Sequence, residues 1–143
     1  MSKLAVTPRC YDLSMDLNEI SGKILDASIQ LHSNLGPGLL ESVYVSLLSD
    51  NLTQRGLLTQ CQVPMPIFYQ GRIFDHGFRA DILVNEAVLV EVKSLERLLP
   101  VHHKQVLTYL RVSGFQLGLL INFGSRRLID GFHRIVNGFV EGP

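Results

Sequence analysis

Residues 79–93 read Arg-Ala-Asp-Ile-Leu-Val-Asn-Glu-Ala-Val-Leu-Val-Glu-Val-Lys, and they are the most informative segment for the fold. Apolar residues run along both sides of the polar pair Asn85-Glu86, which is a turn signal between two strands. The stretch therefore predicts a β-hairpin whose turn is centred on Glu86. In that register Asp81 lies opposite Glu91.

The two faces of this hairpin differ because side chains alternate along a strand. One face ends in three charged residues, Asp81, Glu91 and Lys93. The other is wholly apolar and is predicted to be core, and it consists of Ile82, Val84, Val88, Val90 and Val92.

The charged end of the hairpin predicts a metal site. Directly opposed residues have Cβ atoms about 4.5–5.5 Å apart, a separation at which Asp81 and Glu91 repel each other. A divalent cation between them removes the repulsion, and carboxylate oxygens suit Mg²⁺ or Mn²⁺. Lys93 is then placed to orient a water or to stabilise developing negative charge. A solvent-exposed strand end with ordinary charges explains the same spacing equally well.

The hydrophobic pattern on both sides of the hairpin predicts a mixed α/β domain with a central sheet. The elements predicted in chain order are helices from Leu17 to Gly36 and from Leu39 to Gly56, strands over 57–63, 67–69, 72–74, 78–84 and 87–93, a helix over 101–113, and strands over 115–122 and 127–136. Pro64 and Pro66 are expected to end the first strand, and Gln70-Gly71 to form a turn.

Composition narrows the class of protein. The chain has 143 residues, and we expect an extension over 1–15 followed by a single domain over 16–140. With 46% hydrophobic and 18% charged residues, intrinsic disorder is excluded. Lys plus Arg and Asp plus Glu both number 13, so nucleic acid would have to bind through a local patch rather than through bulk charge. Two cysteines and the lack of a signal-peptide pattern favour a reduced, cytoplasmic protein.

Two predicted helices carry polar residues at the spacing of neighbours on a helix surface. Glu41 and Tyr44 are three residues apart, and the helix dipole alone is a sufficient reason for an acid in the first turn. Gln105 and Tyr109 are four apart, and Tyr109 taken alone is more simply a core aromatic with a solvated hydroxyl.

Four separated motifs make the chain resemble the GxxExxY protein family, and the resemblance covers about residues 17–137. The motifs are Gly38-x-x-Glu41-x-x-Tyr44 within residues 35–44, Glu91-Val-Lys93, Leu-Pro-Val-His over 99–102, and Leu-Leu-Ile-Asn-Phe-Gly over 119–124. That family is placed in the PD-(D/E)xK nuclease-like superfamily. The resemblance implies an α-β-β-β-α-β core, here with an extra N-terminal helix, that typically supports Mg²⁺-dependent phosphodiester cleavage.

The resemblance also implies roles for individual residues. Asp81 and Glu91 match the metal-binding acids, Lys93 matches the motif lysine, and Glu41 matches an additional acid from the helix before the sheet. These four are predicted to be catalytic, and the three acids among them to bind metal. Ala80 stands where the superfamily's name has proline.

Three further residues are predicted to position substrate. Gln105 and Tyr109 are similar to the Gln-x-x-x-Tyr helix motif of RecB-like nucleases, and Tyr44 belongs to the signature at the start of the second helix.

These implications predict a metal-dependent nuclease that hydrolyses DNA or RNA with Mg²⁺ or Mn²⁺. Nucleic acid is the expected partner, no membrane is expected, and a homodimer is compatible with the sequence. The alternative is a non-catalytic nucleic-acid-binding or protein-assembly module that retains the nuclease fold, which the zero net charge favours. A small-molecule phosphoesterase is a third class. Metal binding at Asp81 and Glu91 separates an active enzyme from the module.

Overall fold

The computed structural model describes residues 11–138, so most of the predicted 1–15 extension and the predicted domain end at 140 lie outside the described residues. The helices are α1 (Leu17–Leu35), α2 (Glu41–Gln54) and α3 (Pro100–Ser113), the strands are β1 (Thr59–Tyr69), β2 (Arg72–Val84), β3 (Val88–Lys93), β4 (Leu117–Asn122) and β5 (Phe132–Val136), and a short 3₁₀ turn is η1 (Leu128–Gly131). The predicted α-β-β-β-α-β order is confirmed from α2 to β4, with α1 as the extra helix. Within residues 11–138, no helix is long and apolar enough to cross a membrane.

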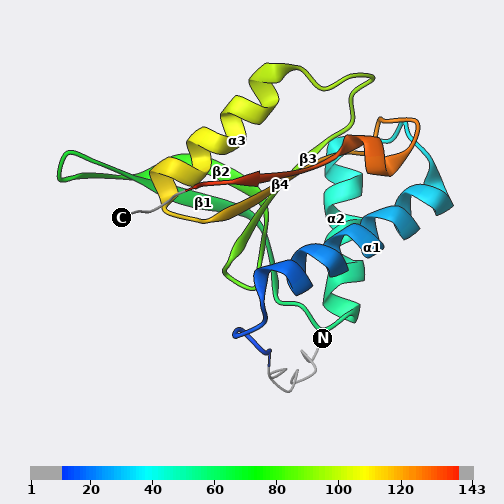
Figure 1. Ribbon diagram of the computed structural model, residues 1–143, viewed down its shortest axis with the longest axis horizontal. Coiled ribbons are helices and arrows are strands. Elements are labelled where there is room, and N and C mark those ends of the chain that lie inside the picture. The colour runs from blue at the N-terminus through cyan, green and yellow to red at the C-terminus, as the bar shows by residue number, and fades with distance from the viewer. Residues whose placement is uncertain (1–10, 139–143) are drawn as a thin grey trace, which may run out of the picture.

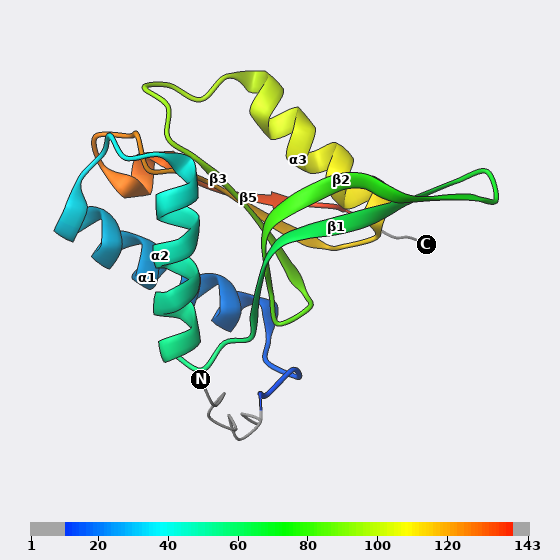
Figure 2. The same cartoon turned by 180° about the vertical axis from the view of Figure 1, so that it is seen from behind.

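One five-stranded mixed sheet organises the domain, in the order β1-β2-β3-β4-β5. Only β3 and β4 are parallel, and a parallel pair needs a crossover, which α3 supplies. Figures 1 and 2 show α3 on one face of the sheet and α1 with α2 on the other. Both faces are therefore covered at the centre, where every residue of β4 is buried.

The hairpin within residues 79–93 has the predicted register, with Leu83 opposite Leu89. Its loop is the three residues 85–87 between the paired Val84 and Val88, and Asn85 and Glu86 in it adopt left-handed φ values of 51° and 53°. The predicted apolar face lies in the core beneath α1 and α2. The opposite face is also covered, because Leu89 packs in a second core beneath α3. Glu91 at the charged end is buried as well, so a solvent-exposed strand end is the wrong interpretation of this face.

The first two strands are longer than predicted. Pro64 and Pro66 do not end β1, which continues to Tyr69, and the predicted strands over 72–74 and 78–84 are one strand, β2. Proline is tolerated here because β1 is the edge of the sheet, where a missing N–H costs no ladder hydrogen bond.

Both long strands are irregular at the level of Asp81. Ala80 packs in the core beneath α3, whereas Ile82 packs in the core beneath α1 and α2. Residues two apart on a regular strand share a face, so β2 turns over at Asp81. On β1 the backbone of Gln62 has φ of 53°, in the left-handed region that residues other than glycine seldom adopt. Both strands therefore depart from regular geometry at the level of Asp81.

Candidate active site

Asp81 and Glu91 meet where β2 and β3 separate. The paired residues of the two strands end at Ile82 and Val90, and beyond them the Asp81 carboxylate accepts a hydrogen bond of 2.8 Å from the backbone N–H of Val92. This carboxylate takes the place of a backbone carbonyl, which turns the side chain toward β3. The carboxyl groups of Asp81 and Glu91 are hydrogen-bonded to each other when one is protonated.

Burial and like charge make this pair unusual. Glu91 is only 5% exposed, and its Oε1 is buried without a hydrogen-bond partner. Burial, followed by the charge of Asp81, raises the pKa of Glu91 to about 8. Burial also raises the pKa of Asp81, against the opposing effects of the Val92 N–H and of Lys93. Without a cation the pair therefore retains a proton near neutral pH.

The residues of this pair fit a divalent cation. A buried carboxylate oxygen with no partner is costly, and a cation is the ligand that would satisfy it. Within residues 11–138 no group of three or more His, Cys, Asp or Glu is arranged to hold a metal ion. Asp81 and Glu91 would thus supply two carboxylates and water the remaining ligands, which is the usual arrangement for Mg²⁺.

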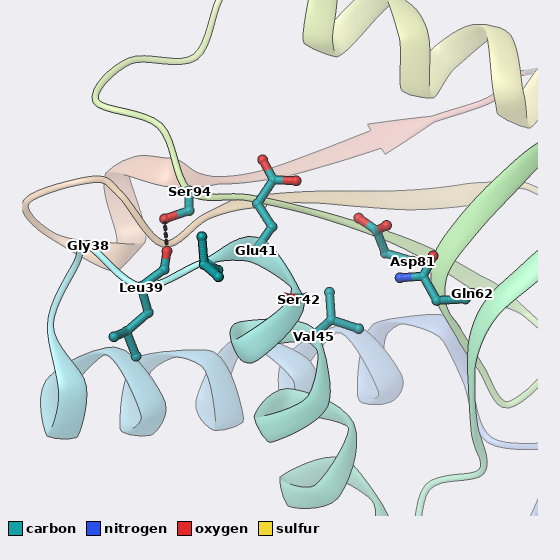
Figure 3. Close-up of a pocket in the computed structure, with 9 residues that line it drawn as sticks. Gly38, Leu39, Glu41, Ser42, Val45, Gln62, Asp81 and Ser94 are labelled. Carbon is teal, nitrogen blue, oxygen red and sulfur yellow. Dashed lines mark hydrogen bonds between the residues drawn. The ribbon is translucent and has the colours of Figure 1, made fainter.

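Glu41 lies in the same cleft as Asp81. It is the first residue of α2, it is exposed, and its charge contributes to the raised pKa of Asp81. The cleft has a volume of about 670 Å³, and Figure 3 shows Glu41 on one side with Asp81 and Gln62 on the other. The structure places Glu41 near the pair without completing a three-acid group.

Tyr44 has a different place from the one predicted. Its side chain has no exposed surface, and its ring stacks on Phe123 with centroids 4.5 Å apart. The hydroxyl donates to the carbonyl of Gly36 at 2.6 Å and accepts from the N–H of Leu39 at 3.2 Å. A fully buried side chain cannot touch substrate, so the predicted direct role is corrected. Tyr44 holds the loop that leads into Glu41.

Two further contributions fix the loop before α2. Gly38 has φ of 112°, which a residue with a side chain rarely adopts, and it lets the loop turn into α2. The hydroxyl of Ser94, the residue after Lys93, donates to the carbonyl of Leu39 at 2.6 Å (Figure 3). The signature therefore fixes the start of α2 against the end of β3.

On the other face, α3 brings Gln105 and Tyr109 toward the acids. The side chains of these two residues are hydrogen-bonded, and the Tyr109 ring stacks on Phe78 with centroids 4.0 Å apart. Burial raises the pKa of Tyr109, and the charges of Glu91 and Asp81 raise it further, so its hydroxyl lies within their field.

A second pocket, of about 540 Å³, separates this helix from the end of β3. It is lined by Lys93, Val101, His102, Lys104, Gln105 and Thr108, none of which is acidic. Lys93 is half-buried between this pocket and the acid pair, and its charge acts on both acids.

Comparison with known families identifies the superfamily of the chain. The family model of the PD-(D/E)XK nuclease superfamily matches residues 18–135, which run from α1 to β5. The chain belongs to the PD-(D/E)XK nuclease superfamily. No curated protein and no solved structure matches it.

One buried residue that supports the superfamily core was not assigned a role from the sequence. Asn122, only 1% exposed, accepts from the N–H of Leu95 and donates to its carbonyl, both at 2.9 Å, and also accepts from the N–H of Gly124 at 3.1 Å. It thereby fixes the backbone just after Lys93. The only signal was its place in the motif over 119–124, which does not reveal a backbone contact.

The second missed residue is Gln62, which lies beside Asp81 in the cleft (Figure 3). It is exposed and adopts a left-handed backbone conformation that costs of the order of 1 kcal/mol for a residue other than glycine. Such strain collects at functional sites, and here it places an amide next to Asp81. A positive φ at glutamine has no signature in the sequence.

Proposed function

We propose that the protein is a nuclease that hydrolyses phosphodiester bonds of DNA or RNA, with Mg²⁺ or Mn²⁺ held by Asp81 and Glu91. One observation carries the proposal: a buried carboxylate oxygen of Glu91 has no partner, beside a second acid and a lysine, in a chain of a nuclease superfamily. We further place the chain in the GxxExxY family, because Gly38, Glu41 and Tyr44 occupy the loop and helix start beside this site.

The reaction divides among the chain's own residues as follows. Asp81 and Glu91 would hold the cation, which when bound lowers the pKa of water and offsets the charge that develops on the phosphate. Lys93 stabilises the negative charge on the non-bridging oxygens as the water oxygen bonds to phosphorus and loses a proton to solvent, and the ester oxygen leaves and takes up a proton from solvent. Glu41 orients water from the opposite side of the cleft. Gln105 and Tyr109 hold the part of the nucleic acid strand next to the scissile phosphate.

The second candidate function is a module that binds nucleic acid without cleaving it. It is favoured by the zero net charge and by the absence, within residues 11–138, of a three-acid metal group. A cleavage assay on single-stranded DNA, duplex DNA and RNA, with and without Mg²⁺ or Mn²⁺, separates the two. Metal-dependent cleavage of any of the three supports the nuclease, whereas binding without cleavage supports the module.

Metal is expected to stabilise the folded protein. A ligand at ten times its Kd adds about 1.4 kcal/mol, which is on the order of 4 °C in melting temperature for a domain of this size. Millimolar Mg²⁺ or Mn²⁺ should produce such a rise in the wild type, and Asp81→Asn should largely remove it. The exposed Asp50 on α2 provides the control, Asp50→Asn, which should respond like the wild type. An unchanged wild-type melting curve with both metals would contradict a metal site.

Substitution of Gln62 by glycine is expected to separate stability from activity. Glycine adopts φ of 53° without strain, so Gln62→Gly should leave stability unchanged or raise it by up to about 1 kcal/mol. Removing the amide from the cleft should nevertheless slow hydrolysis by about 10-fold, the effect of losing one hydrogen bond of roughly 1.4 kcal/mol. Urea unfolding and initial rates on the same preparation measure both. Gln60→Gly, in the same strand, is the control for glycine itself. Full activity in Gln62→Gly would show that the strain has no catalytic purpose.

A further inference from the structure

The distal part of the β1–β2 hairpin, residues 67–74, projects beyond the sheet and the helices (Figures 1 and 2). We call this segment the arm. Its turn residues Gln70 and Gly71 have φ of 48° and 74°, which suits a two-residue turn that keeps the strands paired to the tip. Large apolar side chains on it are exposed to solvent, namely Phe68 (56%), Tyr69 (63%), Ile73 (63%) and Phe74 (46%).

One face of the arm combines a cation with two flat rings. Tyr69 is paired with Arg72, and Phe74 is paired with Ile67, so alternation places Tyr69, Arg72 and Phe74 on the same face. The guanidinium carbon of Arg72 lies over the Phe74 ring, 5.2 Å from its centroid. Exposed rings with a stacked guanidinium are the groups on which the bases of single-stranded nucleic acids stack.

The charge and the edge of the arm favour nucleic acid over a second copy of this chain. Arg72 is the only charged residue between positions 67 and 74, and the exposed Asp75 that follows Phe74 lies by alternation on the opposite face, so the face with Arg72 carries a positive charge and no acid. Pairing with a second copy would use the free edge of β1. Pro64 and Pro66 lack the N–H groups that such pairing requires.

The arm is also continuous with the candidate active site. Its two strands carry Gln62 and Asp81 at their other ends, inside the cleft. The nine residue steps from Arg72 to Asp81 span at most about 30 Å at ~3.4 Å per residue. Phosphates are about 3.4 Å apart along the axis of a stacked strand and roughly twice that in an extended one, so about four to nine nucleotides at most separate the arm tip from the acids.

We propose that the face formed by Tyr69, Arg72 and Phe74 stacks on unpaired bases of a nucleic acid strand whose backbone passes through the candidate active site. This inference rests on the proposed function and extends it, because it makes an extended single-stranded segment part of the preferred substrate.

The test compares two double variants of the full chain. Tyr69→Ala/Phe74→Ala removes the rings of the proposed face, and Phe68→Ala/Ile73→Ala removes equally exposed side chains from the opposite face. Labelled single-stranded oligonucleotides of about 3 nucleotides, too short to reach the arm from the acids, and of about 20 nucleotides are titrated by fluorescence anisotropy in EDTA, so that no cleavage occurs. The first variant should bind the longer strand about 10- to 100-fold more weakly than the wild type and the shorter strand equally well. The second should bind both like the wild type.

Cleavage of the shorter strand, measured with Mg²⁺, separates this inference from the proposed function. Tyr69→Ala/Phe74→Ala should cleave the shorter strand at the wild-type rate. Unchanged affinity of that variant for the longer strand would overturn the role of the arm while leaving the nuclease intact. If the wild type cleaves no substrate, but Tyr69→Ala/Phe74→Ala binds the longer strand more weakly than the wild type, the proposed nuclease activity is wrong and the role of the arm is supported. If light scattering instead shows that the variant converts a dimer to a monomer with unchanged oligonucleotide affinity, the arm contacts a second copy and the inference is wrong.

Discussion

Glu91→Gln is expected to abolish hydrolysis and, in the absence of metal, to make the protein more stable at pH 8. Glu91 is buried beside Asp81, and its pKa rises from an ordinary 4.5 to about 8 in the folded protein. Glutamine has nearly the same shape but carries no charge, so it removes the cost of burying a second carboxylate. It also removes one of the two oxygen donors for the cation, so turnover should fall by about 10³-fold or more.

The sign of the pH dependence follows from which state holds the proton. Between about pH 4.5 and pH 8 the folded protein keeps a proton on Glu91 that the unfolded chain has lost. Stability of the wild type therefore decreases as pH rises through this window, since the folded state binds more protons. The advantage of Glu91→Gln should be small near pH 5 and reach a few kcal/mol near pH 8, with about 1.4 kcal/mol per unit as the upper limit.

Urea unfolding at pH 5 and pH 8 in EDTA measures this difference. Glu86→Gln, in the exposed turn of the same hairpin, is the matched control and should show no pH-dependent gain. Saturating Mg²⁺ should stabilise the wild type and have little effect on Glu91→Gln. A variant that is less stable than the wild type at both pH values would show that the Glu91 carboxylate contributes a structural interaction.

The sequence was sufficient to predict the central hairpin, because its information is local. The apolar runs on both sides of Asn85-Glu86 specify strands, turn and register without reference to the rest of the chain, and the structure has that register. The covering of the charged face was not predictable in the same way. It depends on α3, which forms the crossover between β3 and β4 and packs on that face of the sheet.

Other differences arise where tertiary context overrides a local rule. Proline normally ends a strand, but Pro64 and Pro66 do not end β1 because β1 lies at the edge of the sheet. By spacing, Tyr44 shares a helical face with Glu41. In the structure, however, the Tyr44 ring lies beneath the loop before α2, and of the two residues only Glu41 lines the cleft. The positive φ of Gln62, opposite the irregular point of β2 at Asp81, has no counterpart in the local sequence.

Lys93→Ala is expected to separate catalysis from metal binding. Lys93 is half-buried at the end of β3, its charge acts on Asp81 and Glu91, and it lines the pocket in front of α3. If its ammonium stabilises charge that develops only in the transition state, its loss should lower turnover by about 10²-fold or more. Metal affinity should persist or increase, because an ammonium is not a ligand for Mg²⁺ and its removal takes a positive charge away from the cation.

Turnover, and metal affinity from calorimetry, should be measured on the same preparation of Lys93→Ala. Lys23→Ala on α1 is the control and should match the wild type in both. A lysine that is merely solvated at a strand end would change stability by less than about 0.5 kcal/mol and leave turnover unchanged. If the wild type cleaves nucleic acid and Lys93→Ala cleaves it equally well, the acids and the lysine at the end of β3 are not the active site. A loss of turnover with metal affinity retained assigns Lys93 to the transition state, since a residue needed only to hold the acids in place would change both.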